Sequence, residues 1–151
     1  MLQYQVERLK DIYDDLRPLL DMHWEDVALD QETVHLNPNS ALYRTADDTG
    51  ALHITTARVE DGELVGYAIY LLSSNAHYKQ LAVADGDIFW LHPDHRKGMA
   101  GVRLLRKAEE FLIARGVHKI LNKVKLHKDV GIVFERLGYT PIERVYAKTV
   151  G

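Results

Sequence analysis

The residues best suited to hold a charged ligand lie in one short stretch, His92 to Gly101, with the sequence HPDHRKGMAG. A predicted strand ends just before this stretch, and a predicted helix follows it. The first backbone amides of a helix have no acceptor within the helix, and the helix dipole adds about half a positive charge there. Glycine lets a ligand approach the main chain closely, so this order of elements predicts an anion site. The alternative is an ordinary structural turn.

Positive charge around this turn favours an anion ligand over a plain turn. Five cations lie in the turn and in the first two turns of the following helix: Arg96, Lys97, Arg103, Arg106 and Lys107. Cations at a helix N-terminus oppose the dipole and cost stability unless an anion offsets them. The spacing fits neither Gly-x-x-x-x-Gly-Lys-Ser/Thr nor Gly-x-Gly-x-x-Gly. The sequence therefore predicts a polyphosphate ligand, bound at a glycine turn that follows neither of these two motifs.

The elements that position this turn follow from hydrophobic periodicity and turn residues. Spacings of three and four residues predict an amphipathic helix over 8–24, which Pro18 should bend or interrupt. Asn37 or Asn39 should cap a short second helix that ends at Gly50. Alternating or apolar runs predict strands over 2–7, 51–60, 63–73 and 85–91, with the second and third joined by an Asp61-Gly62 hairpin.

The second half of the chain continues the alternation of strands and helices. Helices are predicted over 101–115 and 129–137, a strand over 118–126, and one or two closing strands over 139–148. The predicted order is β-α-α-β-β-β-α-β-α-β, without linker, repeat or low-complexity segment. We therefore expect one α/β domain over 1–151, with a mixed central sheet of six to seven strands flanked by about four helices.

Composition excludes several classes of protein. The chain has 151 residues, a formal net charge of −3 and no cysteine, so disulfides and thiolate zinc sites are excluded. No stretch approaches the roughly 20 apolar residues needed to span a bilayer, and the N-terminus does not resemble a signal peptide. We expect a cytoplasmic protein without a metal site that binds neither membrane nor nucleic acid.

The turn resembles the coenzyme A pyrophosphate loop of the GNAT family of N-acetyltransferases, whose pattern is Arg/Gln-x-x-Gly-x-Gly/Ala. Arg96 takes the first position and Gly101 the last, while Met99 stands where the family has its middle glycine and Gly98 lies one place early. The stretch VFERLGYTPIE (133–143) resembles the passage from the family's fourth helix to its next strand. The resemblance covers nearly the whole chain. It is closest to bacteriophage-encoded members, on stretches similar to HWE (23–25), His77-Tyr78 and FWLHP (89–93), which implies the cytoplasm of a host cell.

The resemblance implies that the chain binds acetyl-CoA. The strand before the loop should part from its neighbour and pair with the pantetheine arm, and the loop amides should hold the pyrophosphate. His127 falls where the family often places an asparagine against the pantetheine, and Phe134 falls where it has a tyrosine. The residues so assigned to the cosubstrate are Phe89, Trp90, Leu91, Arg96, Lys97, Gly98, Met99, Ala100, Gly101, His127 and Phe134.

The implied reaction is direct transfer of an acetyl group to a primary amine of a small molecule or protein. A lysine-like amine with a pKa near 10.4 is mostly protonated at pH 7, so a base should help. Asp85 and Asp87 should share one face of their strand. Asp87 is the first candidate for the base and Glu25 the second, while a structural carboxylate is the alternative.

Phe134 has no proton to give, which leaves Tyr139, a water molecule or unassisted departure for the thiolate. Recognition of the amine is assigned to His23, Trp24, His77 and Tyr78. A catalytically degenerate acyl-CoA-binding or interaction module is the competing hypothesis, and a structural phage-associated protein is a third. A homodimer is a further expectation for the partners of this chain.

Overall fold

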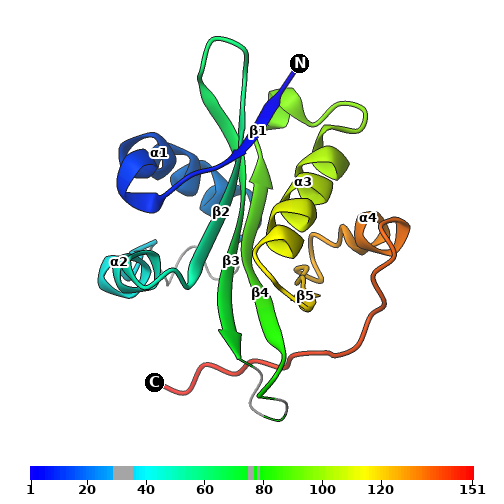
Figure 1. Ribbon diagram of the computed structural model, residues 1–151. Coiled ribbons are helices and arrows are strands. Elements are labelled where there is room, and N and C mark those ends of the chain that lie inside the picture. The colour runs from blue at the N-terminus through cyan, green and yellow to red at the C-terminus, as the bar shows by residue number, and fades with distance from the viewer. Residues whose placement is uncertain (29–35, 75–76, 78) are drawn as a thin grey trace.

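Five strands form one mixed sheet in the order β1-β2-β3-β4-β5 (Figure 1). The computed structural model describes residues 1–28, 36–74, 77 and 79–151. Neighbouring strands are antiparallel except for β4 and β5, which are parallel. The strands are β1 (Gln3–Val6), β2 (Leu52–Arg58), β3 (Leu64–Ser74), β4 (Ala82–Leu91) and β5 (Lys119–Leu121).

Helices cover both faces of the sheet (Figure 1). Helices α1 and α2 lie on one side of it, and α3 and α4 lie on the other. No helix in the described part of the chain is long and apolar enough to cross a bilayer. The helices are α1 (Leu9–Val27), α2 (Ser40–Asp48), the short 3-10 turn η1 (Pro93–His95), α3 (Ala100–Ala114) and α4 (Gly131–Arg136).

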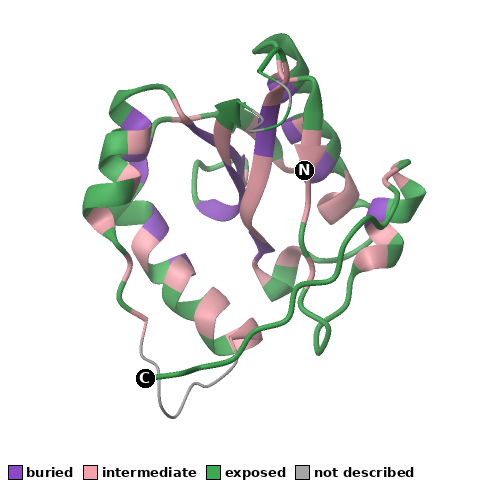
Figure 2. Ribbon diagram, turned by 90° about the horizontal axis from the view of Figure 1, so that it is seen from below, coloured by how far each residue is buried: buried purple, intermediate pink, exposed green. Residues whose placement is uncertain are grey.

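Strand alternation divides the apolar side chains between two cores. Successive residues of β3 point to opposite faces, so Tyr67 and Ile69 face α1 while Ala68 and Tyr70 face α3. The α1 core includes Leu9, Ile12, Leu16 and Leu19 from the helix, and the α3 core includes Leu104, Ala108 and Leu112. Strands β2 and β3 are therefore buried on both faces over most of their length, and Figure 2 colours buried residues purple.

Local signals in the first half of the chain are confirmed, with one exception. The β2–β3 hairpin turns through Gly62 at φ +99°, and the Asn39 side chain caps α2 by accepting from the Leu42 amide at 3.2 Å. The exception is an interruption at Pro18, which the helix does not show: α1 continues through the proline to Val27. The buried apolar face of α1 holds the helix together on both sides of the proline.

The prediction of a sixth and seventh strand is wrong. Residues 139–148 form neither strand, and the segment 140–151 is exposed throughout. The strand predicted over 118–126 is limited to the three residues of β5, whereas β4 begins three residues earlier than predicted. A β-forming composition favours an extended backbone, but a strand needs a paired neighbour. The segment 140–151 passes the lower ends of β3 and β4 in Figure 1 and is not part of the sheet.

The fully buried His53 ties α3 to the sheet. Its Nδ1 lies 3.1 Å from a guanidinium nitrogen of Arg115, which can only donate, so Nε2 carries the proton and donates to Thr55 Oγ1 at 2.9 Å. Burial, reinforced by the Arg115 charge, lowers the pKa of His53 to about 4. The imidazole is therefore neutral in the folded protein at neutral pH.

We expect His53 to make the protein less stable in mild acid. In the unfolded chain, His53 has its ordinary pKa of about 6.5. Between this pH and about 4, the unfolded state therefore binds a proton at His53 and the folded state does not, which favours unfolding. The free energy of unfolding should fall by about 3 kcal/mol from this group as the pH drops from about 6.5 towards 4. Urea titrations at several pH values should show this loss in the wild type and a flatter profile in His53→Gln. Equal pH slopes for the two proteins would contradict the assignment.

Candidate active site

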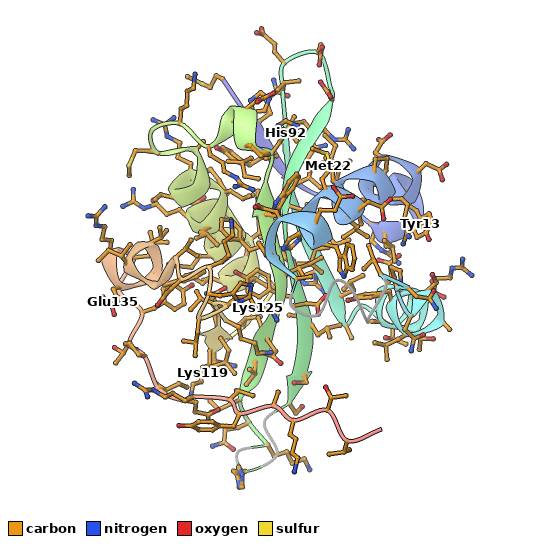
Figure 3. The ribbon with its side chains drawn as sticks, turned by 180° about the vertical axis from the view of Figure 1, so that it is seen from behind. Tyr13, Met22, His92, Lys119, Lys125 and Glu135 are labelled. Atoms are coloured by element: carbon orange, nitrogen blue, oxygen red, sulfur yellow. The ribbon has the colours of Figure 1, made fainter. Side chains whose placement is uncertain are left out.

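Strands β4 and β5 part in the middle of the molecule. Their pairing is limited to Val83–Asp85 against Lys119–Leu121. From Gly86 to Leu91, the edge of β4 on this side has no strand partner among the described residues. Figure 3 shows the two ends of the arrangement, with His92 directly after β4 at one end and Lys119 in β5 at the other. The parting leaves a row of backbone amides and carbonyls open for a ligand.

A β-bulge places Asp87 at the point where the strands part. Ile69 pairs with Ile88 and Tyr70 pairs with Gly86, so Asp87 is the extra residue on β4. A side chain at Gly86 would meet the Leu121 carbonyl oxygen at 2.7 Å, so only glycine allows β4 and β5 to approach here. Bulges redirect side chains and are frequent beside active sites.

The Asp87 carboxylate is held by a tyrosine from α2. Tyr43 donates from its hydroxyl to Asp87 Oδ2 at 2.6 Å. Burial, together with the Asp87 carboxylate, raises the pKa of Tyr43, so the phenol keeps its proton and remains a donor. The half-buried Asp87 is therefore oriented from one side by a fixed hydrogen bond.

Asn122 follows β5 at the same point. Its Oδ1 accepts from the Tyr70 hydroxyl at 2.7 Å, whereas its buried Nδ2 has no hydrogen-bond partner within the described ranges. Nearby, Lys123 Nζ lies 2.8 Å from Asp85 Oδ1 in an ion pair that lacks the alignment of a hydrogen bond. A buried donor without an acceptor is costly, and a ligand carbonyl would satisfy it.

The glycine turn leads into α3 with its backbone amides open. Gly98 adopts φ +61°, a conformation that favours glycine, and the first helical bond runs from the Arg103 amide to the Met99 carbonyl at 2.8 Å. Amides before Arg103 therefore have no acceptor within the helix. A Cβ placed on Gly101 would meet only Phe89 Cζ at 3.9 Å, so the space above this residue is open. The turn joins β4 to α3 in the order of strand, glycine turn and helix that the sequence predicted.

Three of the five cations at this turn are available for a ligand. Lys97, Arg103 and Arg106 are exposed and form no ion pair within the part of the chain that the structure describes. Lys107 pairs with Glu110 at 2.9 Å. Arg96 is exposed but engaged: its guanidinium donates to Asp26 at 2.7 Å and to the Leu91 carbonyl at 2.6 Å. The first residue of the loop pattern therefore braces the turn against the end of α1 and the end of β4.

Asp26, which the sequence analysis did not single out, joins three elements. It accepts from the Trp90 indole at 3.2 Å, from Arg96, and from Lys128 at 3.3 Å. The hydrogen bond from Arg96 in particular lowers the pKa of Asp26 to about 2, so the carboxylate is ionised at neutral pH. The end of α1 is thereby fixed to β4, to the glycine turn before α3 and to the segment after β5.

That segment crosses from β5 to the end of α1. His127 donates from Nε2 to the Val27 carbonyl at 2.8 Å, so its side chain is engaged with α1 rather than with the open edge of β4. Lys125, labelled in Figure 3, lies on the same segment, near the middle of the view between α1 and α3. Contacts from His127 and Lys128 thus join this segment to the end of α1.

The residues predicted to recognise the amine are only partly brought together. His23 lies 2.7 Å from the Tyr67 hydroxyl and stacks on Trp90, and burial lowers its pKa to about 4. Trp24 is half-buried beside it in α1, and Glu25 is exposed. His77 is exposed in the turn between β3 and β4, and Tyr78 lies outside the described residues.

The candidate general acid is placed on the α3 side of the sheet. Tyr139 donates from its hydroxyl to Glu109 at 2.9 Å, and burial raises its pKa, so it keeps its proton. Phe134 is buried between Phe89 and Tyr139, with ring centroids 6.4 and 5.7 Å away. Phe134 thus connects the open strand to Tyr139 by packing and supplies no proton.

Comparison with known proteins agrees with this architecture. The sequence profile described as the acetyltransferase (GNAT) family matches residues 9–139. A comparison with curated protein sequences finds no match.

Solved structures share the fold over essentially the whole chain. A ribosomal-protein-alanine N-acetyltransferase from Brucella melitensis biovar Abortus 2308 is 19% identical, with a TM-score of 0.72 and 100% of both chains covered. An aminoglycoside acetyltransferase from an uncultured soil metagenomic sample, in complex with sisomicin, is 13% identical, with a TM-score of 0.75 and 99% and 97% covered. An acetyltransferase from Clostridium acetobutylicum, solved with acetyl-CoA, is 14% identical, with a TM-score of 0.67 and 99% and 96% covered.

Proposed function

Because the chain belongs to the acetyltransferase (GNAT) family, and is therefore an N-acetyltransferase, we propose that it transfers the acetyl group of acetyl-CoA to a primary amine while both substrates are bound. The observation that carries this proposal is the open edge of β4. This edge begins at the Asp87 bulge and ends at the turn before α3. One extended substrate bound along it can therefore reach from the Asp87 carboxylate to the cations of that turn.

The residues around this edge fit coenzyme A in both charge and hydrogen bonding. The free cations Lys97, Arg103 and Arg106 and the amides before Arg103 suit a pyrophosphate. The edge of β4 along residues 89–91 suits the amides of a pantetheine arm, although Arg96 already donates to the Leu91 carbonyl. The Asn122 Nδ2, which has no partner among the described residues, suits one of the carbonyls of that arm. Asn122 therefore replaces His127 as the expected contact, because His127 is engaged with α1.

The chemical step requires a proton acceptor beside the amine. The neutral amine nitrogen attacks the thioester carbonyl carbon, a C–N bond forms, the C–S bond breaks, and the thiolate leaves with the electron pair. Asp87, directly or through water, takes the proton that the nitrogen must lose. Tyr43 acts as a positioning residue because it holds Asp87 Oδ2. Simultaneous binding of both substrates supplies much of the acceleration.

The thiolate must also gain a proton. Phe134 cannot give one, and Tyr139 is the candidate because its phenol is protonated and its ring packs against Phe134. Its hydrogen bond to Glu109 would have to be exchanged for the sulfur, so water is the alternative source. Glu25 stays the second candidate for the base, on the exposed side of α1 near the end of the helix.

The amine substrate is proposed to enter on the face of the sheet that carries α1 and α2. Asp87 meets Tyr43 of α2 there, and His23 is neutral at pH 7 because burial lowers its pKa. A neutral imidazole does not repel a protonated amine, and the adjacent Trp90 ring offers an aromatic surface. The site therefore suits a primary amine of a small molecule or a protein.

Binding of coenzyme A is the first test of this proposal. Titration calorimetry on the full chain should show one molecule of CoA bound per chain, and CoA should raise the melting temperature. Affinity should fall as salt rises, because exposed cations hold the phosphates. The absence of both heat and thermal shift would contradict the proposal and favour a structural protein.

A further inference from the structure

Lys123 places a primary amine at the point where β4 and β5 part. It directly follows Asn122, and the last pair of the two strands joins Leu121 to Asp85. Its Nζ lies 2.8 Å from Asp85 Oδ1, and 61% of its side chain is exposed. The chain therefore carries an amine of its own near the end of the open edge at which the proposed function puts the acetyl group.

The Lys123 amine is held on the face of the sheet from which the amine substrate is proposed to enter. Residues directly opposite each other on neighbouring strands point to the same face. Asp85 is opposite Leu71, and Leu71 packs against the α1 core. Asp87 reaches the same face, because Tyr43 of α2 donates to it. The two carboxylates and the amine therefore share one face and one end of the open edge.

The ion pair that holds Lys123 can be exchanged easily. The side chains of Lys123 and Asp85 are 61% and 41% exposed, and exposed ion pairs contribute little to stability. A lysine amine stands on a flexible stem of four carbons, so it can move from Asp85 towards the Asp87 bulge without a change in the backbone. The pair thus keeps the amine near the site and leaves it able to react.

We propose that Lys123 is acetylated by the acetyl-CoA bound to its own chain, an inference that rests on the proposed binding of acetyl-CoA along β4. The ammonium first gives one proton to solvent. Its neutral Nζ then attacks the thioester carbonyl carbon, a C–N bond forms, the C–S bond breaks, and the thiolate leaves with the electron pair. Asp87, directly or through water, takes the second proton that Nζ loses.

Proximity makes this step feasible, and its product is a neutral side chain. A lysine amine is mostly protonated at pH 7, but its position beside the bound thioester offsets the small neutral fraction. Acetylation removes the charge of Lys123 and leaves the Asp85 carboxylate without its cation. The modification is limited to one acetyl group per chain, because the modified nitrogen is no longer a nucleophile.

The other lysines of this segment are less favourably placed. Lys119 lies within the paired part of β5, and Lys128 pairs with Asp26 at 3.3 Å. Lys125 is exposed two residues after Lys123 and forms no ion pair within the described part of the chain. Figure 3 labels Lys119 and Lys125, which lie on either side of Lys123 in the chain. Lys125 is therefore the matched control for chemical reactivity.

Mass spectrometry of the full chain, incubated with saturating acetyl-CoA and no external amine, tests this modification. We expect one acetyl group per chain, located at Lys123 by peptide mapping, and one thiol released per chain. The rate per chain should not depend on protein concentration, because the step takes place within one chain. Lys123→Arg, which keeps a positive charge beside Asp85, should lose the modification, whereas Lys125→Arg should keep it.

Chemical acetylation by free acetyl-CoA would give a different pattern. Equal labelling of Lys125 and Lys128, or full labelling of Lys123 in a Gly101→Glu variant that no longer binds CoA, would overturn the proposal. An unmodified Lys123 in a protein that acetylates external amines would overturn it too and leave the proposed function standing. Absence of CoA binding in calorimetry would overturn both. Acetylated Lys123 without turnover on any external amine would support this proposal and contradict the proposed function.

Discussion

Replacing Gly101 with glutamate is expected to abolish CoA binding while the fold persists. A Cβ at this position meets only Phe89 Cζ at 3.9 Å, so the side chain would extend into the open space above the turn. A carboxylate there would occupy the space for the pyrophosphate and repel it. A glutamate in the first turn of α3 suits the helix dipole, so stability should be retained.

Calorimetry should show a loss of affinity of more than about 100-fold in Gly101→Glu, which corresponds to about 2.7 kcal/mol or more. Gly101→Ala is the matched control, since it adds only the Cβ and no charge, and it should bind CoA within a few-fold of the wild type. If Gly101→Glu kept the affinity of the wild type, the pyrophosphate would have to bind elsewhere, and the assignment of the loop would be wrong.

Asp87→Asn is expected to lower turnover by about 100-fold or more with little change in CoA affinity, because general-base catalysis contributes factors of this size. Asparagine keeps the size of the side chain and an oxygen that can accept from Tyr43, so the local structure should persist. Steady-state kinetics across pH should show that the acidic limb of the wild-type profile is lost in the variant.

Two matched variants separate the chemical role of Asp87 from a structural one. Asp85→Asn removes a carboxylate two residues earlier that is paired with Lys123, and it should keep most of the turnover. Tyr43→Phe leaves the Asp87 carboxylate in place without its donor and should lower kcat by a smaller factor, with CoA affinity unchanged. An unchanged pH–rate profile in Asp87→Asn would remove Asp87 as the base.

Most of the sheet and its helices could be predicted from local patterns. Gly62 and Asn39 have conformations or hydrogen bonds that depend on neighbours in sequence, so their turn and cap were predictable. The closing strands were predicted wrongly, because residues 139–148 have the composition of a strand but pair with no strand of the described sheet. Whether a β-forming segment pairs depends on tertiary neighbours, which the sequence pattern does not contain.

The local structure around the candidate site could be predicted where it depends on one segment, and contacts between distant segments could not. The turn around Gly101 has the predicted strand, glycine and helix arrangement, since these residues are consecutive. Tyr43, Asn122 and Asp26 were missed because each reaches the site from a distant element. The Gly86-Asp87 pair was a usable signal, since glycine inside a strand often marks a bulge or a close backbone approach.

Release of thiol from acetyl-CoA in the presence of a panel of primary amines tests the central claim most directly. The panel should include small diamines, aminoglycosides, lysine peptides and peptides with a free N-terminus, and the product should be weighed by mass spectrometry. We predict amine-dependent thiol release with at least one acceptor, one acetyl group added per thiol released, and loss of both signals in Asp87→Asn. Tight CoA binding without turnover on any amine would contradict this account and identify the chain as an acyl-CoA-binding module.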